Sequence, residues 1–169
     1  MSTTQNQIAQ IAQLSQALGE QLLHLGWTVT SAESCTGGGI SQAITDTPGS
    51  SGWFNQSWVT YSNAAKHGQL GVSETTLQTQ GAVSSDVVYQ MAAGAARQAQ
   101  AELALAVSGV AGPTGGTPDK PVGTVWFGCF CHGDTTTEVQ CFNGDRASVR
   151  EQAVLHALQL GLSKIRQHR

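Results

Sequence analysis

The sequence predicts an α/β fold, a three-layer α/β/α sandwich with a mixed, mostly parallel sheet of about five strands. Segments with a helical period alternate with short β-prone runs along the whole chain. Residues 103–107 form a continuous apolar run of strand length, which is typical of a strand covered on both faces. Two further β-prone runs, at 122–131 and 135–142, flank the turn 132–134 and predict an antiparallel pair within the sheet.

The first part of the chain begins with a predicted helix. Apolar residues recur with a helical period over 8–25, and Gly26 follows where a C-cap is expected. A short strand through Val29 comes next, then a turn of small polar residues and a helix to about Thr45. The Gly- and Ser-rich segment after Pro48 is a loop, and the aromatic and β-branched stretch 53–61 predicts another strand.

In the second part, serines mark the expected helix starts. A short helix begins around 61–66, Ser73 is expected to cap a second one over 74–78, and Ser84 or Ser85 to cap a longer one that ends near Ala99. Asp145 is expected to cap a final helix over 146–165. Its predicted inward residues are Val149, Ala153, Ala157, Leu158, Leu162 and Ile165. Because no repeat and no linker interrupts the pattern, residues 1–169 are expected to form a single domain.

Composition limits the function classes. Only 11% of the 169 residues are charged, against roughly 25% in an average chain, and the net charge is −3. This balance argues against nucleic-acid and membrane partners, which need a basic surface. The sequence has no apolar run long enough to span a membrane and no signal-peptide pattern at its start, so a cytoplasmic protein is expected.

Metal-ligand spacing is absent from the sequence. The four cysteines show no CxxC or paired zinc pattern and are expected to be reduced thiols, and the five histidines are scattered. No metal and no cofactor are therefore expected.

Three polar clusters follow predicted strands, at 34–38, 61–66 and 108–116. In open α/β sheets, ligands bind where loops leave the carboxyl ends of strands, so these clusters are expected to form one pocket. The first cluster also precedes a helix, whose free N–H groups and dipole predict an anion site. The sequence therefore favours chemistry on a phosphorylated small molecule.

Ser34 and Lys66 are the leading candidates for catalysis. A serine needs a base before it can attack, and a lysine desolvated in a pocket can supply a neutral amine. Tyr61 could relay the proton or orient that amine. The alternative is that Ser34 or Thr36 only caps the helix and donates to a phosphate, with Cys35 as a rival nucleophile or a buried structural thiol.

The third cluster and Arg146 are candidates for substrate binding. Glycines in 108–116 allow the backbone to approach a ligand, and Ser108 or Thr114 could donate to it. The same loop could equally be a tight connection without a ligand. Arg146 could bind a phosphate or carboxylate bidentately, or could pair with Asp145 or Glu151.

Several motifs in a fixed order resemble the C-terminal domain of the competence-damage-inducible protein CinA, over about residues 12–162. They comprise 32–38 (AESCTGG), Tyr61-Ser62-Asn63 with Lys66, Gly81-Ala82-Val83-Ser84, 108–113 (SGVAGP) with Gly115-Gly116, 120–125 (KPVGTV) and Gly144-Asp145-Arg146.

This resemblance implies a nicotinamide mononucleotide amidohydrolase that recycles pyridine nucleotides, with a small-molecule nucleotide as substrate and a homodimer as the assembly. It implies Ser34 as nucleophile, Lys66 as its base and Tyr61 as an assisting residue. Substrate-binding positions are expected at Cys35, Thr36, Gly37, Gly38, Ser108, Gly109, Gly112, Gly115, Gly116 and Arg146.

Two positions depart from the family pattern. Ala64 stands where an acidic residue is common, which bears on the environment of Lys66, and Gly39 stands where larger residues are common. Larger relatives carry an additional N-terminal domain that is not found in this sequence, so no pyrophosphatase activity is expected. Two other functions remain open, a nucleotide-binding module without catalysis and a Ser/Lys hydrolase that acts on some other amide or ester.

Overall fold

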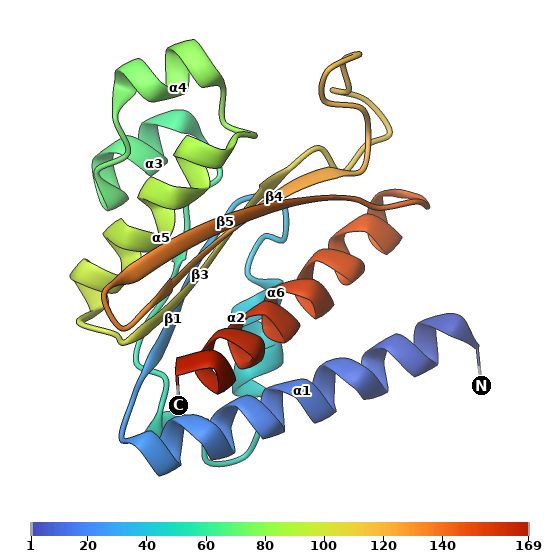
Figure 1. The fold of residues 1–169 in the computed structure, drawn as a ribbon. Coiled ribbons are helices and arrows are strands. Elements are labelled where there is room, and N and C mark those ends of the chain that lie inside the picture. Colours follow the sequence, from blue (N-terminus) through green and yellow to red (C-terminus); the bar gives the residue numbers. More distant parts are fainter. Residues whose placement is uncertain (1, 169) are drawn as a thin grey trace.

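The structure is a computed structural model that describes residues 2–168. It is a three-layer α/β/α sandwich, as the sequence predicts (Figure 1). The strands are β1 (Val29–Glu33), β2 (Trp58–Val59), β3 (Leu103–Gly109), β4 (Thr124–Cys131) and β5 (Asp134–Cys141). The helices are α1 (Thr3–Leu25), α2 (Gly39–Thr45), α3 (Asn63–Leu70), α4 (Glu74–Gln80), α5 (Ser85–Ala99) and α6 (Arg146–His168), with a 3₁₀ turn at Ser50–Gly52.

The sheet has five strands in the order β2-β1-β3-β4-β5. The pairs β1–β2 and β1–β3 are parallel, whereas β3–β4 and β4–β5 are antiparallel. Every residue of β1 and almost every residue of β3 is buried, which confirms the prediction for 103–107. Because β1, β2 and β3 run in one direction, their carboxyl ends lie at the same edge, and the candidate site forms there.

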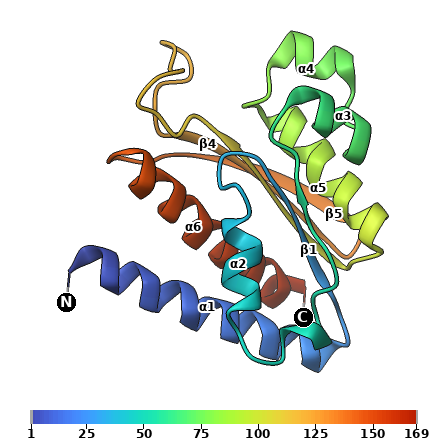
Figure 2. The same cartoon turned by 180° about the vertical axis from the view of Figure 1, so that it is seen from behind.

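Helices cover both faces of this sheet (Figures 1 and 2). One face carries α5, with α3 and α4 packed against it, and the other carries α2 and α6, with α1 packed on that pair. Each face has its own apolar core: Leu105, Phe127 and Leu158 belong to the α6 side, and Val88, Met91 and Ala106 to the α5 side. Gly128 of β4 lets α5 approach the sheet closely, because a Cβ there would clash with the backbone of Val88.

The predicted helix ends are confirmed by their capping bonds. Gly26 ends α1 in the left-handed conformation, with φ +69°. The side chains of Ser73 and Ser84 accept the N–H of Thr76 and Val87 respectively, and Asp145 Oδ1 accepts the N–H of Ser148 at 2.9 Å. All six predicted inward residues of α6 are buried.

The prediction of a strand over 53–61 is wrong except at Trp58–Val59. Trp53 is buried, but its indole ring lies against Gly19 of α1 and so belongs to the helical layer. Ahead of β2, the segment contacts β1 through an isolated bridge between Val29 and Phe54 and through Thr30 Oγ1, which donates to Gln56 O at 2.7 Å. The apolar character of this segment therefore reflects burial against a helix, which periodicity alone cannot distinguish from a strand.

The predictions for the hairpin turn and for the cysteines agree with the structure. The turn between β4 and β5 consists of His132 and Gly133, both with positive φ, as two-residue hairpin turns require. All four cysteines are free. Between residues 2 and 168, no helix combines the length and apolarity that crossing a membrane would demand.

The contact between α5 and α3 gives a stability prediction. A Cβ at Gly94 would lie 2.1 Å from Leu70 O, so Gly94→Ala should destabilise the protein by about 3 kcal/mol through overpacking. Gly68 in α3 has open space around it, and Gly68→Ala should raise stability by about 0.5 kcal/mol. Urea unfolding of both variants checks this pair, and equal effects would contradict the described packing.

Candidate active site

The structure brings the three polar clusters together at the carboxyl edge of the sheet. The N–H of Ser34, just after β1, donates to Val107 O of β3 at 3.0 Å. The N–H of Thr60, just after β2, donates to Glu33 O at 2.9 Å. Ser108 and Gly109 are the last two residues of β3 and adjoin Val107. Backbone bonds thus hold the start of each cluster in a fixed position relative to the others.

Ser34 and Lys66 are in direct contact. Lys66 Nζ lies 3.0 Å from Ser34 Oγ, and it also donates to the carbonyl oxygens of Thr60 at 2.8 Å and Tyr61 at 3.0 Å. Ser34 is 8% exposed and Lys66 is 1% exposed. The two carbonyls and the hydroxyl hold the amine in one orientation, and no acidic side chain among the described residues forms an ion pair with it.

Burial lowers the pKa of Lys66 below that of an ordinary lysine. Desolvation lowers the pKa of its ammonium group to about 8. A neutral amine is therefore accessible near physiological pH, and it would accept the Ser34 proton over a hydrogen-bond distance. Ala64, in the first turn of α3, is exposed, so the buried state of Lys66 does not depend on that position.

Cys35 is not poised for nucleophilic attack. It is buried, and desolvation raises the pKa of its thiol to about 11, so the thiol stays protonated at neutral pH. Its carbonyl oxygen instead accepts a bond from Arg150 Nε at 3.0 Å. Of the two rival nucleophiles in this turn, only Ser34 is next to a base.

The Tyr61 side chain lies away from the lysine. It is 60% exposed, and its hydroxyl accepts a bond from Arg146 Nη2 at 3.3 Å. Only the backbone carbonyl of Tyr61 contacts Lys66. Arg146 also donates to Gly112 O at 2.9 Å, and in the described chain it forms no ion pair with Asp145 or Glu151. Tyr61 and Arg146 therefore form one wall of the site, together with the 110–123 loop.

Glu33 occupies the anion position that the sequence analysis expected at the start of α2. Its carboxylate is fully buried and accepts the N–H groups of Ile40 at 2.8 Å and Ser41 at 3.0 Å. It also accepts the hydroxyls of Thr36, Ser31 and Ser41. The expectation that these helix N–H groups bind a ligand is wrong, because the protein supplies its own carboxylate. The hydroxyl of Thr36 is likewise committed to Glu33.

Three other N–H groups of the turn remain free for a ligand. Gly37 and Gly39 donate within the turn, to Ser34 O and Thr36 O. The N–H groups of Cys35, Thr36 and Gly38 have no acceptor within residues 2–168. Gly38 has φ +100°, a conformation that favours glycine, and it bends the chain into α2.

In the 110–123 loop the glycines serve close packing as well as a possible ligand. A Cβ at Gly112 would lie 2.5 Å from Val122 Cγ1, and one at Gly116 would lie 2.8 Å from Val122 N. Gly115 has a positive φ and little around it. The loop projects beyond the end of the sheet (Figure 1), and residues 113–119 are exposed.

Sequence reasoning missed two residues, Glu33 and Arg150. Arg150 donates to Cys35 O and, at 3.3 Å, to Thr36 O, so it braces the turn that carries Ser34. It lies four residues after Arg146 and hence on the same face of α6. That spacing was the available signal. For Glu33 the signal was an acid at the end of a buried strand just before a helix start.

Comparison with known proteins assigns the family. The CinA C-terminal domain profile matches residues 11–165. The chain belongs to this family. The enzyme named nicotinamide-nucleotide amidohydrolase PncC from Enterobacter agglomerans is 56% identical over 151 residues, covering 89% of this chain and 92% of its own.

Two further family relatives agree with this assignment. The protein of the same name from Escherichia coli K12 is 51% identical over 152 residues, covering 89% of this chain and 92% of its own. The crystal structure of competence damage-inducible protein A (ComA) from Klebsiella pneumoniae superposes with a TM-score of 0.91 at 37% identity. It covers 94% of this chain and 99% of that one, so the CinA fold extends over nearly the whole molecule.

The bonds of Glu33 give a prediction for the turn. In Glu33→Gln either orientation of the amide places an NH₂ group against a backbone N–H, of Ile40 or of Ser41. Unfolding free energy should therefore fall by about 3 kcal/mol, because a buried N–H loses its acceptor. Ser41→Ala removes only hydroxyl bonds and should cost about 1 kcal/mol. Urea unfolding measures both, and a Glu33→Gln protein as stable as wild type would contradict the described contacts.

Proposed function

We propose that this chain is an amidohydrolase that converts nicotinamide mononucleotide to nicotinate mononucleotide and ammonia. The observation that carries the proposal is the buried Lys66 amine 3.0 Å from Ser34 Oγ, at the sheet edge where loops converge. The relatives at 51–56% identity bear the name nicotinamide-nucleotide amidohydrolase, which supports the same substrate. Both the chemistry and the family thus favour hydrolysis of a linear amide.

In the proposed reaction, Ser34 Oγ attacks the carboxamide carbon while the neutral Lys66 amine accepts its proton. The oxygen of the tetrahedral intermediate takes the negative charge. The free N–H groups of Cys35, Thr36 and Gly38 are the nearest unengaged donors in the turn and are assigned here to that oxygen. Lys66 then returns the proton to the nitrogen as the C–N bond breaks, and ammonia leaves an ester on Ser34.

Hydrolysis of that ester reverses the same roles. Lys66, neutral again, accepts a proton from water as the water oxygen attacks the ester carbon. The C–O bond to Ser34 breaks, the proton passes to Ser34 Oγ, and the carboxylate product leaves. The carbonyls of Thr60 and Tyr61 hold the amine in place through both halves, since they accept two of its hydrogens.

The substrate phosphate is assigned to the arginine side of the site. The start of α2 is filled by Glu33, whereas Arg146 and Arg150 lie on one face of α6 beside the Ser34 turn. Arg146 retains its Nε–H, and guanidinium groups bind phosphate in a planar, bidentate manner. Ser108, Gly109 and the glycines of the 110–123 loop would then border the rest of the nucleotide.

The proposal extends to the setting of the enzyme. The reaction needs no metal or cofactor for any step described above, and it would recycle pyridine nucleotides in the cytoplasm. The four free thiols support a reducing compartment. A homodimer remains the proposed assembly, and neither a membrane nor a nucleic acid is proposed as a partner.

Turnover of nicotinamide mononucleotide is the direct test. Wild type should release ammonia and nicotinate mononucleotide in equal amounts, with chelator present. Ser34→Ala and Lys66→Met should lower kcat by at least about 10³-fold, because each removes one member of the nucleophile–base pair. Ammonia release and product chromatography measure this, with circular dichroism to show that both variants are folded.

Control measurements distinguish this reaction from the two alternatives, a nucleotide-binding module without catalysis and a hydrolase for other amides or esters. A binding module would bind the nucleotide, measured by calorimetry, without any product from wild type. A hydrolase for other amides would process nicotinamide riboside or simple amides as well as the phosphorylated substrate. If Lys66→Met retained wild-type turnover, the assigned base would be wrong even if the reaction were right.

The lowered pKa of Lys66 predicts the pH profile. The base is the neutral amine, so kcat/KM should rise about tenfold per pH unit below pH 8 and level off above it. Measurement from pH 6.5 upwards avoids the phosphate titration near pH 6. A profile that falls over this range would mean that Lys66 acts in its protonated form.

A further inference from the structure

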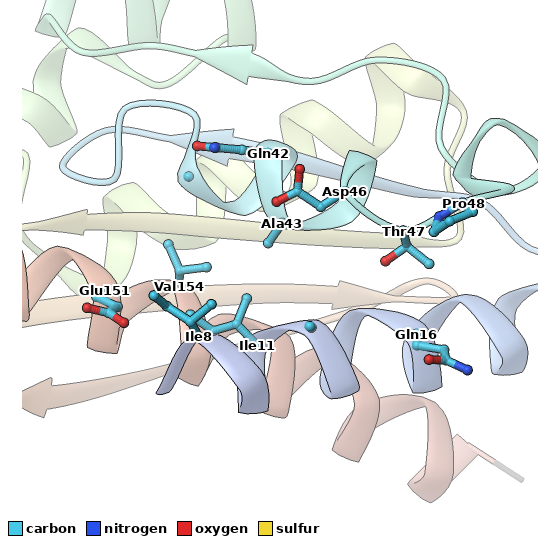
Figure 3. Close-up of a pocket in the computed structure, with 12 residues that line it drawn as sticks. Ile8, Ile11, Gln16, Gln42, Ala43, Asp46, Thr47, Pro48, Glu151 and Val154 are labelled. Carbon is cyan, nitrogen blue, oxygen red and sulfur yellow. The ribbon is translucent and has the colours of Figure 1, made fainter. Parts of the chain in front are cut away.

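A cavity lies on the α1 side of the molecule, and neither Ser34 nor Lys66 lines it. It is a groove between α1, α2 and α6 with a volume of about 530 Å³ (Figure 3). This volume is within the usual range of small-molecule sites, roughly 300–1,000 Å³. Twelve residues line it, and of the Ser34 turn only Gly39, at the start of α2, is among them.

The walls of the groove are mostly apolar. Ile8 and Ile11 come from α1, Ala43 from α2 and Val154 from α6, and these side chains point toward the space between the helices in Figure 3. Ile8 is 58% exposed, so much of its apolar side chain is in contact with water. An apolar body placed here would remove that surface from water.

The charges on the walls are all of one sign. Asp46, at the end of α2, and Glu151, on α6, are the charged residues that line the groove. Neither forms an ion pair within residues 2–168. One carboxylate oxygen of Glu151 is buried and has no hydrogen-bond partner among the described residues. A buried, unpaired carboxylate oxygen is costly, and a nearby cation would offset that cost.

Gly39 keeps one end of the groove open. A Cβ at this position would lie 2.9 Å from Val154 Cγ2, so any side chain here would press on the groove wall. The open end of the groove therefore depends on a glycine at this position.

We propose that the groove binds a small amphipathic organic cation, with an ammonium or guanidinium head group on an apolar body. The head group would lie beside the carboxylate of Glu151, Asp46 would add negative charge farther along the groove, and the body would pack on Ile8, Ile11 and Val154. Charge complementarity selects the cation over a neutral or anionic ligand, since the groove has no basic side chain in its lining. The groove would bind such a cation whether or not the proposed hydrolysis takes place.

Calorimetry with three matched probes tests the proposal. These are 4-phenylbutylammonium, 4-phenylbutanol and 4-phenylbutanoate, which share one apolar body and differ in charge. The ammonium probe should bind about tenfold tighter than the alcohol, and the carboxylate should bind most weakly. The double variant Asp46→Asn/Glu151→Gln should erase the preference for the ammonium probe. Equal affinities of the three probes for wild type would overturn the proposal.

A blocking variant locates the binding. Ala12 is an exposed residue of α1 that lines the groove, and Ala12→Phe should fill it and weaken the ammonium probe at least about tenfold. Ala9→Phe, exposed on the same helix but outside the lining, is the matched control and should bind like wild type. Binding unaffected by Ala12→Phe would overturn the assignment.

The oligomeric state gives a further outcome. Light scattering should show that Ala12→Phe and Ala9→Phe have the wild-type mass. If Ala12→Phe alone changed the mass, a second copy of the chain would cover this groove and the proposal would be overturned. Turnover of nicotinamide mononucleotide by the same proteins is recorded separately, so its loss or retention has no bearing on the binding result.

Discussion

The buried carboxylate of Glu33 is the contact on which the catalytic turn depends. It joins the last residue of β1 to the N–H groups of Ile40 and Ser41 in α2, and the five residues between β1 and α2 must therefore form a tight turn. A helix start normally attracts an external anion. Here the chain satisfies it internally, which leaves only the N–H groups of Cys35, Thr36 and Gly38 for a substrate. One acid thus shapes the turn and also determines which donors a ligand can reach.

Lys66 shows how a fold can lower a pKa without a neighbouring charge. Its amine is surrounded by carbonyl oxygens and a hydroxyl, and desolvation is the cause of the lowered pKa. The carbonyls orient the amine toward Ser34 but do not carry the full charge that would stabilise the ammonium form. An acid in contact would raise the pKa again. Ala64 is exposed and takes no part in the environment of the amine, which comes from Thr60, Tyr61 and the packing of α3.

Local signals predicted most of the fold and only part of the site. The caps at Ser73, Ser84 and Asp145 and the apolar period of α6 are properties of neighbouring residues, so they could be recognised in the sequence. The contacts of Trp53 with Gly19 and of Arg150 with Cys35 join residues far apart in the chain, and no local pattern encodes them. The resemblance to the family already paired Ser34 with Lys66, whereas the 3.0 Å contact and the two carbonyls that orient the amine came only from the folded chain.

Helix α2 connects the catalytic turn to the rest of the molecule. Seven residues are too few for a helix to be stable alone, so its position depends on Glu33 at one end and on the burial of Ile40 and Ile44 along its length. One end of α2 therefore lies against the turn of Ser34, and its outer face forms a wall of the groove. The groove and the active site share this helix, and α6 likewise contributes Arg150 to the turn and Glu151 to the groove. Any displacement of α2 or α6 by a groove ligand would act directly on the elements that hold Ser34 in place.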